Sequence, residues 1–301
     1  MNEPKRHHYI PQFILKTFSF DGKGHVHYYS KFNGKTSCEE IRNTFMALHL
    51  YRDEINSPDF PTVLEHDLAR FESDVAQIIN QKFLRSNQIT LSMEEDSKLR
   101  LFFAIMGLRS ERTRNFFASS MPHSSRSLYA NYQHDGDLVT LWKRNLSYAV
   151  SCRSIDEILN HPQIDAPFKA FLKRDSDYIC GLYFSVAERK DCEEFLLSDC
   201  YPIVFTGVLP NGLPLQMYSV FPISPDRVIF MMSNGVEGAP PKELGFRPLV
   251  AAIPRMNGNG TYTIRVKKLY AEEVKPINDA IYKNAAYGVI FKTARAEFEN
   301  A

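Results

Sequence analysis

Short aromatic and apolar runs between glycine turns open the chain. The run His25–Ser30 reads HVHYYS, with Gly22–Gly24 before it and Asn33–Gly34 after it. Glycine turns on both sides of such a run are typical of a β-hairpin. We therefore predict strands and turns over residues 1–36.

From residue 37 the apolar positions recur every three or four residues, which is the spacing of an amphipathic helix. Four capping boxes, each a Ser or Thr followed three residues later by Glu, introduce such stripes: Ser37–Glu40, Thr62–Glu65, Ser92–Glu95 and Ser154–Glu157. The second stripe comprises Leu64, Leu68, Phe71, Val75, Ile78 and Ile79. These signals predict a mainly helical middle over residues 37–175, including a helix that begins at Ser37.

Strand-like runs dominate from residue 176 onward. They are Tyr178–Val186, Phe195–Phe205, Leu213–Ile223, Val228–Met232 and Thr261–Val266. Only the tail, about Lys275–Tyr287, returns to helical spacing. This segregation predicts an α+β fold with an N-terminal β-hairpin, a helical middle and a mainly antiparallel C-terminal sheet. The three segments, 1–36, 37–175 and 176–301, are also compatible with one compact domain.

Composition places the chain among ordinary globular proteins. Of its 301 residues 44% are hydrophobic and 24% charged, which excludes collagen, coiled coil and disorder. The net charge of +1 means that nucleic-acid binding would need a local basic patch. The longest apolar stretch, Leu101–Met106, is too short to cross a bilayer. An odd number of irregularly spaced cysteines, five, favours a reducing cytoplasm, and no signal peptide is visible.

Two tempting motifs have simpler interpretations. A P-loop needs a glycine five residues before Gly34–Thr36, where Tyr29 stands instead, so this stretch is read as a turn. His25 and His27 lie two residues apart and should share one face of a strand, where they could bind a metal. A polar edge of the sheet is the more common outcome for such a pair.

The most unusual segment contains two consecutive histidines, His7 and His8. On an extended chain their rings point to opposite faces, so one pocket can take only one of them directly. Pro11 favours extended geometry at Ile10. A functional role and a surface pair are both open on the residues alone.

This segment carries a family resemblance. The stretch His7–Ser19, HHYIPQFILKTFS, resembles the opening signature of the uncharacterised family called domain of unknown function 4238, roughly HHY-[VI]-PQF-x-L-x-x-F. Looser matches follow in family order over nearly the whole chain, at Leu108–Thr113, Phe195–Ile203, Phe221–Pro225 and Asn278. Cys200–Tyr201 and Leu197 depart from the family pattern. The family has no established activity, so the resemblance implies site residues and not a reaction.

The same opening resembles, more weakly, the hairpin of HNH nucleases. That resemblance implies that His7 binds a divalent metal, Mg²⁺ or Mn²⁺, and that His8 activates water as a general base. Asn43 and His49 would be the further site residues. On the predicted helix they are six residues, or about 240°, apart and could not share a face.

Other candidate residues follow strand and helix ends. Asp199 closes a predicted strand, where its carboxylate would serve as a metal ligand or base, or would cap the turn backbone. Arg109 and Arg112 are neighbours on a predicted helix and would bind phosphate, or would pair with Glu111 in a solvated face. The remaining candidates for substrate contact are Gln12, Ser198 and Asn278.

Together these features predict a cytoplasmic bacterial enzyme acting on phosphodiesters, a metal-dependent nuclease effector in phage defense whose partner is nucleic acid. His8 and Asp199 would be catalytic, with His7 and Asp199 on the metal. The alternative is a non-catalytic sensor or interaction protein. Clustering of these groups in a concave pocket favours the enzyme, and burial as satisfied core hydrogen bonds favours the alternative. The N-terminal segment should pack against the C-terminal sheet.

Overall fold

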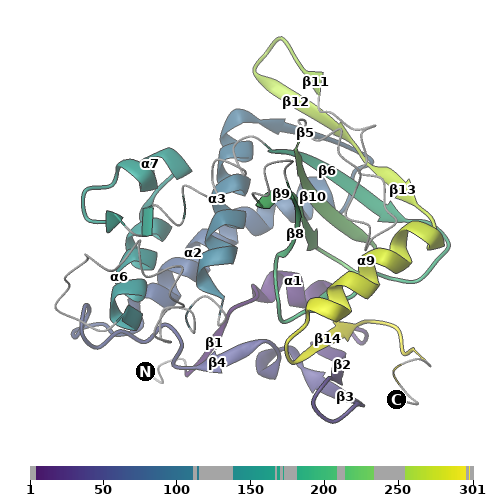
Figure 1. The fold of residues 1–301 in the computed structure, drawn as a ribbon, viewed down its shortest axis with the longest axis horizontal. Helices are drawn as coiled ribbons and strands as arrows, with labels where there is room; N and C mark the ends of the chain where they lie inside the picture. Colours follow the sequence, from purple (N-terminus) through teal and green to yellow (C-terminus); the bar gives the residue numbers. More distant parts are fainter. Residues whose placement is uncertain are drawn as a thin grey trace. The chain divides into compact units, whose positions relative to one another are not determined.

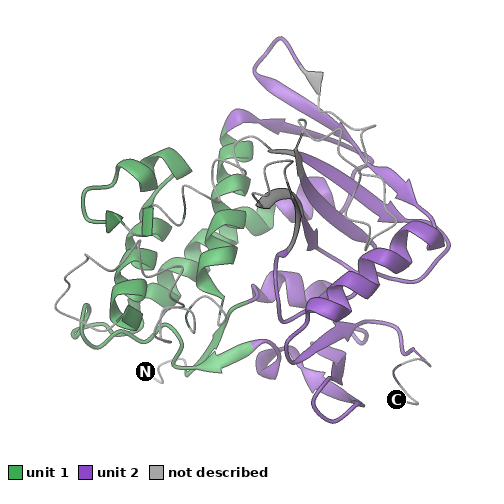
Figure 2. Ribbon diagram, viewed as in Figure 1, with its two compact units in different colours: residues 1–9, 46–77, 94–180 green, residues 10–45, 78–93, 181–301 purple. Residues whose placement is uncertain are grey.

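The structure is a computed structural model. It describes residues 5–110, 114, 138–166, 168–169, 172, 182–208, 214–233, 255–295 and 298. The chain forms two compact units, shown in Figure 2. Unit 1 contains residues 1–9, 46–77 and 94–180, and unit 2 contains residues 10–45, 78–93 and 181–301. Both units therefore draw on several separate stretches of the chain, whereas the segments read from the sequence were consecutive.

Unit 1 combines a short strand pair with helices (Figure 1). Strand β1, Arg6–His8, pairs antiparallel with β4, Met46–Leu48, and places His7 opposite Ala47. The helices are α2, α3, α6 and α7, with bounds Val63–Ile78, Met93–Arg109, Leu138–Ser151 and Ile155–Asn160. A π-helical turn, Ile79–Phe83, continues α2 into unit 2.

Three of the four predicted helix starts are confirmed. Helix α2 begins directly after Thr62 and α3 directly after Ser92. Helix α7 follows Ser154, whose hydroxyl accepts the Glu157 N–H at 3.1 Å. The predicted apolar face of α3, which includes Phe102 and Phe103, is buried.

The prediction of a helix that begins at Ser37 is wrong. Residues Lys35–Glu40 form strand β3, which pairs antiparallel with β2, His25–Ser30. The Ser37 hydroxyl donates to the Glu39 carboxylate at 2.8 Å and caps no helix. Cross-strand pairing with β2 outweighs the local capping pattern here, because most helical stability comes from tertiary packing. A 3₁₀ turn, Ile41–Asn43, then leads to β4.

Unit 2 is built around antiparallel sheets, as predicted for the C-terminal half. Its largest sheet has the order β13-β6-β10-β9-β8, with bounds Lys267–Leu269, Leu182–Arg189, Arg227–Ser233, Pro214–Pro222 and Ile203–Val208. Strand β13 runs parallel to β6, and the other described pairs of this sheet are antiparallel. A second sheet, β3-β2-β14-β7, adds β14, Gly288–Phe291, and β7, Leu197–Ser198. A third, β11-β12-β5, comprises Arg255–Met256, Thr261–Arg265 and Gln88–Ser92.

Two α-helices belong to the described part of unit 2. Helix α9, Ala271–Asn284, starts four residues before the predicted tail helix and buries Val274, Ile277 and Ile281 in the core. Helix α1, Gln12–Thr17, lies directly after the His-His segment. The Thr17 hydroxyl donates to the Ile223 carbonyl at 3.0 Å. This bond joins the end of α1 to the residue after β9, which agrees with the predicted packing against the C-terminal sheet, whereas the preceding strand β1 pairs with β4.

The helical middle and the antiparallel C-terminal sheets together give the α+β fold that the sequence predicts. Among the described residues, no helix combines the length and apolar character needed to cross a membrane.

Candidate functional site

His7 occupies a defined and completely buried position in unit 1. Strand β1 directs its imidazole onto Tyr51, with ring centroids 5.6 Å apart and planes 9° from parallel. The Nδ1 atom accepts the Tyr51 backbone N–H at 2.8 Å. Because a backbone N–H only donates, the ring proton must be on Nε2. A metal on Nε2 would force this proton to Nδ1, facing the Tyr51 donor, so this geometry disfavours His7 as a metal ligand.

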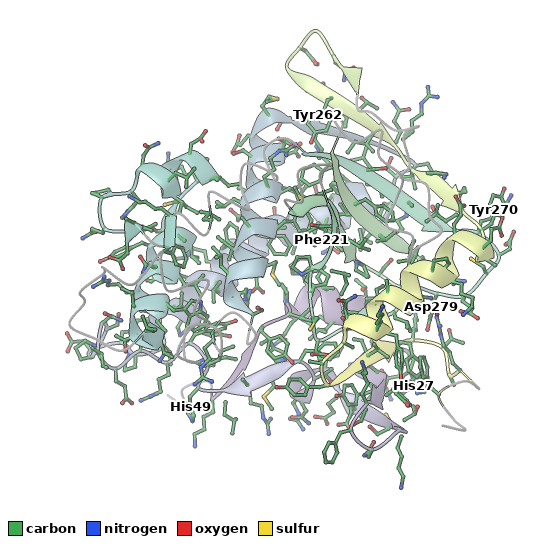
Figure 3. The ribbon with its side chains drawn as sticks, viewed as in Figure 1. His27, His49, Phe221, Tyr262, Tyr270 and Asp279 are labelled. Carbon is green, nitrogen blue, oxygen red and sulfur yellow. The ribbon has the colours of Figure 1, made fainter. Side chains whose placement is uncertain are left out.

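The structure brings His49 to His7. Their ring centroids are 6.5 Å apart in an edge arrangement, and His49, labelled in Figure 3, is exposed just after β4. On the predicted helix, Asn43 and His49 would have pointed to different faces. Asn43 instead belongs to a 3₁₀ turn, and His49 is the residue after strand β4. His49 has φ +53°, in the left-handed region. Among the described residues, no three His, Cys, Asp or Glu side chains form a group that could hold a metal.

The strand pair His25 and His27 does share one face, as predicted. Both rings approach Phe20, with centroids 6.3 Å and 4.5 Å away. The Nδ1 atom of His25 pairs with Asp21 at 2.5 Å, and His27, labelled in Figure 3, also stacks on Phe291. These contacts describe an aromatic and ion-paired cluster.

Arg109 is the centre of the polar cluster in unit 1. It ends helix α3 and its guanidinium is only 2% exposed. One N–H group donates to each of three partners: the Tyr51 hydroxyl at 3.1 Å, the Glu72 carboxylate and the carbonyl oxygen of His8. Arg109 also lies over the Tyr51 ring, with Cζ 5.4 Å from the centroid. Three of its five N–H donors are therefore engaged.

Helix α2 supplies two carboxylates to this cluster. Glu65 and Glu72 are seven residues apart, so they lie on one face of the helix, two turns from each other. Glu72 forms the ion pair with Arg109. The Oε2 atom of Glu65 is buried and has no hydrogen-bond partner among the described residues.

The two glutamates have different electrostatic environments. Burial, reinforced by the charge of Glu72, raises the pKa of Glu65 to about 7, and Arg109 opposes this rise. Burial likewise raises the pKa of Tyr51 to about 12. Burial thus favours the protonated form of Glu65 in this cluster.

Sequence reasoning missed Glu65, Glu72 and Tyr51. Glu65 and Glu72 directly follow Leu64 and Phe71 in the apolar stripe of α2. Two acids spaced by seven residues beside an apolar stripe were the available signal, because acids are rarely buried without a partner. Tyr51 gave no comparable signal.

Asp199 has a clear structural role in unit 2. Its Oδ1 atom accepts the backbone N–H groups of Ala286, Tyr287 and Gly288, each at 3.1 Å. The carboxylate thereby caps the chain entering β14, and its neighbour Ser198 donates to the Cys200 carbonyl at 2.8 Å. Of the two roles left open by the sequence, this contact set matches the cap.

The other candidate residues are distributed over both units. Asn278, on α9, is buried, accepts the Leu196 N–H at 3.0 Å and donates to the Glu194 carbonyl at 2.8 Å. Gln12 is exposed at the start of α1. Arg112 lies outside the described residues. His8 is buried in unit 1 and Asp199 in unit 2, so their predicted shared pocket stays a prediction.

The model of the family described as "Protein of unknown function (DUF4238)" matches residues 6–295. The chain belongs to this family. The matched residues of this DUF4238 protein include residues of both units. Neither the curated proteins nor the solved structures include a match to the chain. The resemblance to HNH nucleases gains no support from these comparisons.

Proposed function

We propose that this DUF4238 protein is an acid–base enzyme acting on phosphodiesters and that Glu65 transfers the proton. The observation that carries the proposal is the buried Oε2 atom of Glu65, which has no hydrogen-bond partner in the described part of the chain and feels the charge of Arg109. Burying a polar atom without a hydrogen bond costs stability, and such costs persist mainly where function requires them.

The pair of glutamates supports acid–base chemistry. Glu72 is held in an ion pair, whereas Glu65 has a pKa near 7 and can donate or accept a proton at neutral pH. A carboxyl whose pKa is raised by burial, near a second carboxylate held in an ion pair, is typical of acid–base sites. Glu65 therefore replaces His8 as the proposed general base.

The choice of phosphodiesters rests on Arg109. Two of its five N–H donors make no hydrogen bond to a described residue, and a guanidinium fork binds phosphate oxygens well. We further propose a cytoplasmic setting, as a nuclease effector against phage. The cysteines among the described residues are free thiols, which is compatible with a reducing compartment.

A specific observation favours the second candidate, a non-catalytic sensor or interaction protein. His7, Arg109 and Asp199 all direct polar atoms to the backbone of their own units. Satisfied buried hydrogen bonds of this kind hold a fold together. In this case the buried carboxyl of Glu65 would destabilise the fold and take no part in catalysis.

A cleavage assay separates the two candidates. Single-stranded and duplex RNA and DNA are incubated with and without Mg²⁺ or Mn²⁺, using wild type, Glu65→Gln and His8→Ala. Asp74→Asn is the matched control, since Asp74 is an exposed acid on the same helix α2. We expect Glu65→Gln to lose at least about 100-fold in rate, the scale of acid–base catalysis. Absence of cleavage by wild type, or an equally active Glu65→Gln, would favour the second candidate.

A further inference from the structure

We propose that Glu72 and Tyr51 are positioning residues, which hold the Arg109 guanidinium and thereby keep the proton of the site on Glu65. This inference deepens the proposed function, on which its catalytic meaning rests. It concerns which of two carboxyl groups on one helix face forms the ion pair with the buried Arg109 guanidinium. That choice can be measured without any substrate.

Glu72, and not Glu65, forms the ion pair with Arg109. Its carboxylate forms the ion pair with Arg109 Nη1, while the buried Oε2 atom of Glu65 has no hydrogen-bond partner among the described residues. Arg109 carries one positive charge, so full pairing with Glu72 leaves Glu65 with only a partial share of it. The negative charge of Glu72 further disfavours ionised Glu65.

Tyr51 fixes the guanidinium from another side. Its hydroxyl accepts a hydrogen bond from Arg109 Nε at 3.1 Å and donates to the Arg109 carbonyl oxygen at 2.9 Å. These two bonds tie the side chain of Arg109 to its own backbone. The carbonyl oxygen of His8 holds the Nη2 atom. The cation therefore has three fixed contacts and cannot turn to Glu65 without breaking some of them.

The charged and titratable groups around Glu65 come from three elements. Helix α3 contributes Arg109, α2 contributes Glu72, and the segment after β4 contributes Tyr51. From β1, a carbonyl oxygen of His8 reaches the same guanidinium. Removing either Glu72 or Tyr51 should let Arg109 move toward Glu65 and stabilise its ionised form.

The test is a pH titration of the Glu65 side-chain carboxyl by ¹³C NMR in the full chain, with the signal assigned by its absence in Glu65→Gln. We expect a midpoint near 7 in wild type and a fall of about one pH unit or more in Glu72→Gln. Tyr51→Phe should lower the midpoint in the same direction. Asp74→Asn, the exposed acid of the same helix, should leave it unchanged.

Circular dichroism shows whether Glu72→Gln and Tyr51→Phe fold. If one of them does not, the other still tests the inference. A wild-type midpoint near 4.5, or unchanged midpoints in the folded variants, would overturn the inference. The titration needs no enzymatic activity. A protein that cleaves nothing yet shows the expected shifts would refute the proposed function and leave the placement of the proton standing.

Discussion

Tyr51 and Arg109 are joined by hydrogen bonds in both directions. The Tyr51 hydroxyl donates to the Arg109 carbonyl oxygen at 2.9 Å and accepts a hydrogen bond from Arg109 Nε at 3.1 Å. A single hydroxyl thereby satisfies one backbone and one side-chain group at the end of α3. Since Tyr51 also stacks on His7 and donates its own N–H to that ring, it connects β1 to α3 within unit 1.

We predict that Tyr51→Phe destabilises the protein by about 3 kcal/mol. The ring contacts with His7 survive, but the Nε donor and the carbonyl oxygen of Arg109 both lose a buried partner, each worth about 1–3 kcal/mol. Urea denaturation of the two proteins measures the difference. Tyr148→Phe is the control, because the Tyr148 ring stacks on His161 and its hydroxyl makes no hydrogen bond to a described residue. A loss no larger than that of the control would mean that the hydroxyl contacts contribute little.

Stability should depend on pH through Glu65. Below about pH 4.5 this side chain is protonated in both the folded and the unfolded chain, so it has no effect. Between about 4.5 and 7 the unfolded chain releases the proton while the folded one retains it, and the free energy of unfolding falls as pH rises. Above that window the loss is complete.

Glu65→Gln removes this titration. We expect the variant to be about 2 kcal/mol more stable than wild type at pH 8 and equal to it at pH 4, after allowance for solvent screening. Denaturation curves at several pH values provide the measurement, with Asp74→Asn as the control. A constant difference between wild type and Glu65→Gln across the range would show that Glu65 titrates normally.

Asp199→Asn distinguishes a backbone cap from a catalytic acid. An amide keeps one acceptor oxygen but replaces the other with a donor, so the N–H groups of Ala286 and Gly288 lose charge-assisted bonds. We predict a loss of about 2–3 kcal/mol in stability, with the cleavage rate of the folded fraction unchanged. The control is Asp226→Asn, an exposed acid paired with Arg189 in the same unit.

The opposite pattern for Asp199→Asn, intact stability with roughly 100-fold slower cleavage, would return Asp199 to the catalytic role that the sequence suggested.

Periodicity was a good guide where an element buries one continuous face. The stripes of α2 and α9 predicted helices close to their observed bounds, because burial of those faces is what stabilises them. At Ser37 the same reasoning failed. The residues Ser37–Glu40 satisfy a capping pattern, yet they gain more from pairing with β2, a partner that local sequence cannot reveal.

The candidate site was only partly predictable for a related reason. His7 and Arg109 stood out as residue types, and the structure places both in one cluster. Their bonding partners, Tyr51 and Glu72, lie 44 and 37 residues away along the chain. Which acid pairs with Arg109 depends on how α2 packs against α3. The identities and positions of the charged residues in the sequence do not determine that packing.

The pH dependence of cleavage tests the central claim most directly. Initial rates on an RNA and a DNA oligonucleotide are measured for wild type and Glu65→Gln from about pH 5.5 to 8.5, with Mg²⁺ or Mn²⁺. The account predicts a wild-type inflection near pH 7 and rates at least about 100-fold lower in a folded Glu65→Gln. A wild-type profile that Glu65→Gln reproduces in both height and inflection would contradict it, as would a wild-type protein that cleaves neither substrate.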